Sequence, residues 1–148
     1  MKKKYLGITE YLAHQTKTKN YAMLIYNKDL SVCPLTTHLP LKKVSKKINK
    51  NIIKKKIKLI DTFYKKNLGY KPKMAITGLN PHCESVDSFD EDKKIIKPTI
   101  NSLNKLNYKI SGPLPADTIF LRNNRKKYNV IIGMYHDQVL TPLKTLVE

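Results

Sequence analysis

Residues 130–138 read VIIGMYHDQ, a short run of bulky and β-branched residues that ends in a histidine and two polar residues. Residues 30–35 and 74–79 are similar short apolar runs, bounded by Asn, Gly or Pro. Runs of this length and composition are typical of buried strands in an α/β sheet. The sequence therefore predicts an α/β fold built around these three strands.

A histidine follows closely after each of the three runs: His38, His82 and His136. Ligands of open α/β sheets bind outside the carboxyl ends of the strands, where residues distant in sequence can meet. Neutral imidazole is a common zinc ligand, and three protein ligands leave one coordination position open for a substrate. The pattern predicts a catalytic metal site. The alternative, for any one histidine taken alone, is a hydrogen-bonded residue at a strand end with no ligand.

Four ordered motifs surround these histidines: TTHLPL at 36–41, GLNPH at 78–82, GPLPADT at 112–118 and MYHDQ at 134–138. In this order and at these separations, residues 7–144 resemble the 4-hydroxythreonine-4-phosphate dehydrogenase family of pyridoxal phosphate biosynthesis. The resemblance implies a metal-dependent oxidoreductase that uses NAD or NADP. It also implies an α/β/α sandwich like that of isocitrate and isopropylmalate dehydrogenases.

The resemblance also assigns roles to single residues. His38, His82 and His136 match the family's metal ligands, and the metal would be zinc, cobalt or magnesium. Thr9 and Lys144 match residues that contact the substrate, a small phosphorylated hydroxy amino acid. The family is a homodimer with its active site at the subunit boundary, which implies that histidines of one chain complete the partner's metal site.

Two aspartates are candidates for supporting roles. Asp137 follows His136 directly, and metal-bound histidines usually donate their second ring N–H to a carboxylate or carbonyl. Asp117 is predicted either to cap a helix that runs to about Arg122, or to orient a metal-bound histidine or the substrate amine. No GxGxxG occurs, so any nicotinamide site is not of the Rossmann fingerprint type, and no cofactor-binding or catalytic residue is assigned.

Two segments depart from the family pattern. The family reads GHTE where residues 7–10 read GITE, and Ile8 cannot make the hydrogen bond of the family histidine. This leaves open a related substrate, such as erythronate or threonate 4-phosphate. After GLNPH the family commonly continues with AGE, whereas this chain has Cys83 and Glu84 in a slightly shorter segment, where Glu84 could replace the family glutamate.

The length also differs from that of the family. The chain has 148 residues and resembles only the middle of a longer, two-lobed enzyme. We therefore expect a single α/β region, residues 1–148, without the family's amino-terminal strands and carboxy-terminal part. Because the absent parts carry further substrate-binding residues and most of the nicotinamide pocket, an inactive fragment is a further alternative.

The net charge is +18, which raises the alternative of a non-catalytic protein that binds nucleic acid through its basic surface. Of the 29 basic residues, however, only Arg122 and Arg125 are arginines. Arginine is favoured for bidentate contacts to phosphates and bases, so the composition argues against specific nucleic-acid recognition. The sequence shows no membrane span or signal peptide, and two cysteines are too few for a disulfide framework, so we expect a cytoplasmic protein.

Periodicity and turn residues predict the remaining elements. A short helix is expected at 9–16 with Thr9 as a candidate cap, and a hairpin should join 21–26 to 30–35. Residues 41–67 predict one long amphipathic helix, ended by Gly69, whose lysine face is expected to be solvated rather than bound to a membrane. A second helix is expected at 90–106, and a brief strand at 108–111.

Overall fold

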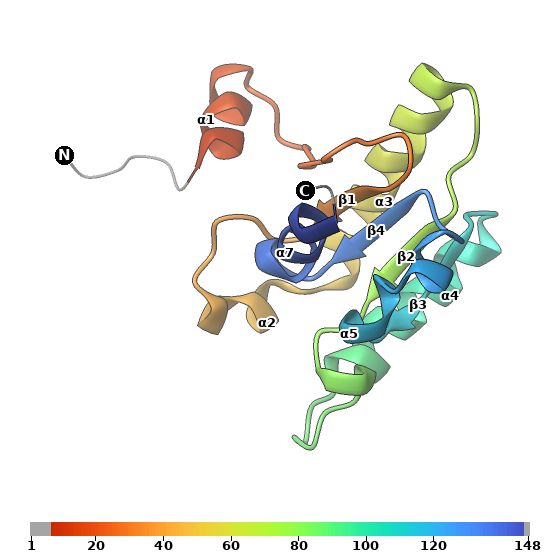
Figure 1. Cartoon of the computed structure of the whole chain (residues 1–148). Coiled ribbons are helices and arrows are strands. Elements are labelled where there is room, and N and C mark those ends of the chain that lie inside the picture. The colour runs from red at the N-terminus through yellow and green to blue at the C-terminus, as the bar shows by residue number, and fades with distance from the viewer. Residues whose placement is uncertain (1–6, 147–148) are drawn as a thin grey trace.

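A computed structural model describes residues 7–146 of the chain. Its centre is a four-stranded sheet in the order β1-β4-β2-β3 (Figure 1). The strands are β1 (Ser31–Pro34), β2 (Met74–Thr77), β3 (Ile110–Leu114) and β4 (Val130–Gly133). All three pairings are parallel. The predicted α/β class is confirmed, and β1, β2 and β4 lie within the three apolar runs that predicted them.

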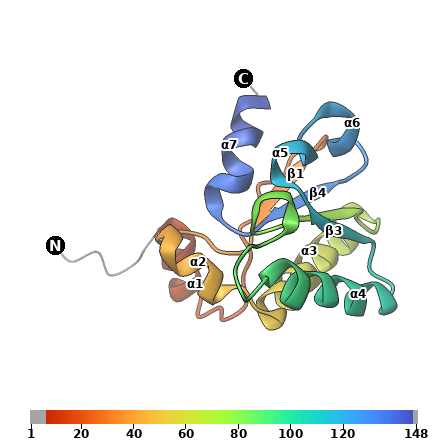
Figure 2. The ribbon, with the colours of Figure 1, turned by 90° about the horizontal axis from the view of Figure 1, so that it is seen from below.

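Helices cover both faces of the sheet (Figure 2). On one face, α3 (Lys50–Phe63) and α4 (Lys97–Lys105) pack against Met74, Ile76 and Ile132. On the other face, α5 (Ala116–Ile119) and α7 (His136–Leu146) pack against Val32, Ala75 and Ile131. Because successive strand residues point to opposite faces, these short apolar runs supply both cores. The result is the expected α/β/α sandwich.

The other helical segments are short. They are α1 (Ile8–Gln15), η1 (Leu41–Lys43), α2 (Val44–Lys47), η2 (Tyr64–Leu68), η3 (Pro81–Cys83), η4 (Asp92–Ile96) and α6 (Arg122–Arg125). Together, η4 and α4 confirm most of the helix expected at 90–106. Within residues 7–146, no helix has the length and apolar character needed to cross a membrane.

The prediction of one helix over residues 41–67 is wrong at its beginning. Ile48 has an extended ψ of 118°, and the chain turns there before α3 begins. Asn49 caps α3, because its side-chain oxygen accepts a hydrogen bond from the amide of Ile52 at 3.0 Å. Val44 and Ile48 are still buried in the same core, so the apolar spacing continues across a break in the backbone. The end was predicted correctly, since Gly69 follows the last turn with a φ of 75°.

Four further predictions need correction. The hairpin is reduced to one antiparallel bridge between Ile25 and Val32. Helix α1 begins at Ile8 after Gly7, so Thr9 is not its cap. Helix α5 begins after Pro115 and ends at Ile119, with Asp117 in its first turn and making no side-chain cap. Strand β3 also begins later than predicted and continues through the GPL of the GPLPADT motif.

The cap at Asn49 gives a test of the broken helix. Replacing Asn49 with Ala removes the acceptor for the Ile52 amide and should lower the free energy of unfolding by about 1 kcal/mol. Urea denaturation measures this change. The control is Asn51→Ala, which alters an exposed residue in the first turn and should leave stability equal or slightly higher. Equal effects of the two substitutions would contradict the helix start at Lys50.

Candidate active site

The carboxyl ends of the parallel strands meet at one edge of the sheet, and the three predicted histidines follow these ends. His38 lies in the loop after β1, His82 in the turn after β2, and His136 at the start of α7 after β4. The loop after β1 is tied to the end of β4, since Thr36 donates both its backbone N–H and its hydroxyl to the carbonyl of Met134. This pairing brings His38 toward His136.

The rings of His38 and His136 lie side by side, with centroids 5.7 Å apart and planes tilted by 40°. Each ring has its Nδ1 against a carboxylate. Nδ1 of His38 lies 2.9 Å from Oε2 of Glu10, and Nδ1 of His136 lies 2.7 Å from Oδ1 of Asp137. A carboxylate at Nδ1 favours the tautomer that leaves Nε2 as the lone-pair donor. These two side chains therefore fit a divalent ion bound through Nε2.

Glu10 was not identified from the sequence, although it lies in the GITE segment. It extends from α1 to His38, and its other carboxylate oxygen accepts a hydrogen bond from the hydroxyl of Thr37. Partial burial acts to raise the pKa of Glu10, but hydrogen bonds from Thr37 and His38, together with a backbone hydrogen bond, outweigh it and the pKa is lowered. Glu10 is thus held as a carboxylate facing His38.

His82 has a different setting. It lines a cavity of about 300 Å³ together with Asn80, Asp117, Tyr135 and Gln138. Within residues 7–146 of one chain, no three His, Cys, Asp or Glu side chains are grouped as a metal site requires. The structure therefore brings together two of the three predicted ligands, and it places the third with Asp117 beside a neighbouring cavity.

The two predicted substrate-contacting residues lie on helices. Thr9 is half-buried on α1, and Lys144 is exposed in the last turn of α7. Their contacts with substrate remain predictions. For Asp117, the helix-cap alternative is wrong, and the alternative in which it orients a ligand or the substrate remains a prediction.

Gln138 holds the ends of β2 and β4 together, a role that sequence reasoning missed. Its Oε1 accepts hydrogen bonds from the Thr77 hydroxyl at 2.8 Å and from the Met134 amide at 2.7 Å. Its Nε2 donates to the carbonyl of Gly78 at 2.8 Å. The residue lies in the MYHDQ motif together with Met134, but its other two partners, Thr77 and Gly78, lie at the end of β2. Gln138 thus links the turn that carries His82 to the helix that begins with His136.

The Gln138 contacts predict the effect of an almost isosteric change. In Gln138→Glu, a carboxylate oxygen would replace the N–H donor and face the carbonyl of Gly78, so stability should fall by about 2 kcal/mol. Denaturant unfolding at neutral pH measures the loss. Asn123→Asp makes the same amide-to-acid change at an exposed position and should change stability by less than about 0.5 kcal/mol. A Gln138→Glu variant as stable as the Asn123→Asp variant would refute this role.

Comparison with known proteins gives matches that agree with one another. The family "Pyridoxal phosphate biosynthetic protein PdxA" matches residues 1–148. The chain is 42% identical over 144 residues to the 4-hydroxythreonine-4-phosphate dehydrogenase of Sulfurihydrogenibium sp. (strain YO3AOP1), covering 96% of this chain and 44% of the relative. It is 38% identical over 144 residues to the D-threonate 4-phosphate dehydrogenase of Salmonella typhimurium, with the same coverage. The chain thus spans less than half the length of these relatives.

Solved structures agree with this result. The crystal structure of 4-hydroxythreonine-4-phosphate dehydrogenase from Klebsiella pneumoniae matches with a TM-score of 0.83 and 36% identity, over 97% of this chain and 45% of that one. A terephthalate 1,2-cis-dihydrodioldehydrogenase from Burkholderia xenovorans LB400 matches with a TM-score of 0.79 at 20% identity, over 94% of this chain and 45% of that one. The second likeness concerns the fold alone.

Proposed function

Because the chain belongs to the PdxA family of pyridoxal phosphate biosynthetic proteins, we propose that it acts as a metal-dependent NAD or NADP dehydrogenase of a phosphorylated four-carbon hydroxy acid. The observation that carries the proposal is the pairing of His38 with His136, each with its Nδ1 on a carboxylate. In this proposal, residues 1–148 correspond to the middle of the longer relatives.

The proposed substrate is 4-phosphohydroxy-L-threonine. Oxidation of its secondary alcohol would give 2-amino-3-oxo-4-phosphobutanoate, which decarboxylates to 3-amino-2-oxopropyl phosphate. The second candidate is a threonate or erythronate 4-phosphate. Two observations favour it: D-threonate 4-phosphate dehydrogenases are among the relatives at similar identity, and Ile8 stands where the resemblance expects a histidine.

Each residue of the proposed site has a chemical role. His38 and His136 would hold a zinc, cobalt or magnesium ion, and His82 of a second subunit would complete the ligand set. When bound, the ion supplies a Lewis acid that lowers the pKa of the substrate hydroxyl. Thr9 donates or accepts a hydrogen bond with the substrate, and the positive charge of Lys144 pairs with its phosphate or carboxylate. A nicotinamide, when bound, would supply the hydride acceptor for this oxidation.

A mixing experiment tests the shared metal site. His82→Ala and His136→Ala should each bind almost no metal alone. When the two variants are co-expressed, half of the dimers are mixed and each has one intact site, so about a quarter of the wild-type metal content should return. Metal analysis of the purified proteins measures this.

Metal content, together with polynucleotide binding, separates the alternatives. If each site took all three histidines from one chain, no mixture could rebuild it, and co-expression would recover nothing. Salt-sensitive binding of a polynucleotide by a wild-type protein that takes up no metal would instead support the basic nucleic-acid-binding alternative.

The substrate choice can be tested at Ile8, which is 67% exposed on α1. If the substrate is 4-phosphohydroxy-L-threonine, Ile8→His should restore one hydrogen bond and raise kcat/KM by about tenfold, equivalent to about 1.4 kcal/mol. The control is Leu12→His, at another exposed apolar position on the same helix. A wild-type protein that oxidises D-threonate 4-phosphate more efficiently, with no gain for Ile8→His on the amino substrate, would favour the second candidate.

A further inference from the structure

Asp92 is a buried carboxylate next to the turn that carries His82, and its side chain is directed at that turn. The residue is 1% exposed. Its Oδ1 accepts the backbone N–H of Leu79 at 2.8 Å, and its Oδ2 accepts the backbone and side-chain N–H groups of Asn80, each at 3.0 Å. Burying a carboxylate is costly unless hydrogen bonds compensate it. Here all three compensating donors belong to residues 79 and 80.

The turn itself has an unusual backbone. His82 has a φ of 55° and Cys83 a φ of 61°, in the left-handed region that disfavours residues with a side chain. Each of these two residues costs on the order of 1–3 kcal/mol of backbone strain, so contacts from outside the turn must hold them in place. Asp92 supplies such contacts at Leu79 and Asn80, three and two residues before His82. Gly78 leaves room for it, because a Cβ there would lie 2.8 Å from Oδ1 of Asp92.

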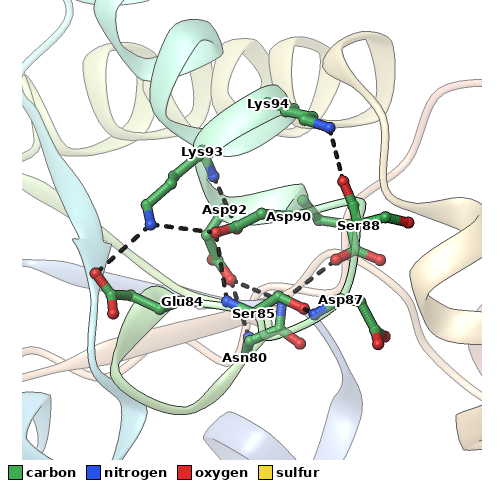
Figure 3. Close-up of polar contacts among 10 residues, drawn as sticks. Asn80, Glu84, Ser85, Asp87, Ser88, Asp90, Asp92, Lys93 and Lys94 are labelled. Carbon is green, nitrogen blue, oxygen red and sulfur yellow. Dashed lines mark hydrogen bonds and ion pairs between the residues drawn. The ribbon is translucent and has the colours of Figure 1, made fainter.

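A second carboxylate, that of Asp90, binds the segment that follows the turn (Figure 3). Asp90 accepts hydrogen bonds from the amides of Ser85 and Lys93 at 3.3 and 3.1 Å. The ammonium group of Lys93 lies 3.6 Å from both Asp90 and Glu84. Asp90 therefore fixes the segment after the turn, whereas Asp92 fixes the residues that lead into it.

We propose that Asp92 is a positioning residue, whose carboxylate holds the 78–82 turn and so sets the direction in which His82 presents its ring to the metal. This inference rests on the proposed function, in which His82 is a ligand. Groups that orient a metal ligand typically contribute 10- to 100-fold in metal affinity. Since Asp92 touches the turn and not the ring, its substitution should alter ligand geometry while His82 remains present.

The test is the affinity and visible absorption spectrum of the cobalt-loaded protein. Asp92→Asn keeps the shape of the side chain but places an N–H group among N–H donors. We expect Co²⁺ affinity to fall by at least about tenfold, with a changed spectrum because the ligand geometry changes. Without metal, the amides of Leu79 and Asn80 should exchange with deuterium faster than in the wild type.

Two controls separate positioning from general destabilisation. Asp61→Asn alters another carboxylate, which lies on α3, is 5% exposed and pairs with Lys65 of η2, and should lower stability without changing Co²⁺ affinity or spectrum. Asp87→Asn removes the same charge from an exposed position in the loop that precedes Asp92 and should change neither. Should Asp92→Asn fail to fold, Asn80→Ala removes one of the three hydrogen bonds to Asp92, together with the contact of the Asn80 side chain to Glu91 at 3.3 Å, and should produce a smaller loss of affinity in the same direction.

The outcomes distinguish this inference from the proposed function. Wild-type protein that binds no Co²⁺, or His82→Ala that binds it unchanged, would overturn both. A wild type that binds Co²⁺ through His82, with folded Asp92→Asn or Asn80→Ala of unchanged affinity and spectrum, would overturn the positioning role alone.

Discussion

The parallel pairing of β4 with both β1 and β2 is the constraint on which the site depends. It places the carboxyl ends of three strands at one edge, so that loops from distant parts of the chain leave from neighbouring points. The central strand can hold this place because Val130, Ile131 and Ile132 are completely buried. Its apolar residues thus contribute to both cores. After β4 the chain continues to His136, which lies between the segments that carry His38 and His82.

Hydrogen-bond acceptors then fix the histidine rings and the turns, which the sheet alone places only approximately. Glu10 and Asp137 each bind one ring nitrogen of a histidine, whereas Asp92 and Gln138 bind the backbone of the turns between the strands and the histidines. A buried acceptor with all its donors on one turn costs free energy if that turn moves. The polar groups at this edge therefore restrict the directions of the side chains, which the apolar core alone would not do.

The strands and the histidines were predictable because their signals are local. Short runs rich in bulky residues and bounded by polar turns favour buried strands, although the run at 21–26 forms only a single bridge. The break before Asn49 was not predictable from the apolar pattern, since Val44 and Ile48 keep helical spacing and remain buried across it. The supporting contacts were missed for a different reason: Glu10 lies 28 positions from His38, and Asp92 lies 13 positions from Leu79. No local pattern reports contacts that only the folded chain creates.

Within residues 7–146 of one chain, the proposed ligand set is incomplete, because His82 lies apart from the His38–His136 pair. Helix α1 has no buried residue, yet it supplies Glu10 to His38 and carries Thr9. Its Ile8 and Leu12 are 67% and 54% exposed, and the nearby TTHLPL motif ends in Leu41, which is 68% exposed. Apolar side chains at these positions gain free energy when another surface covers them. In the proposed homodimer, a second subunit that brings His82 to the His38–His136 pair would be the natural surface to cover α1, so that metal binding and helix stability would depend on the same association.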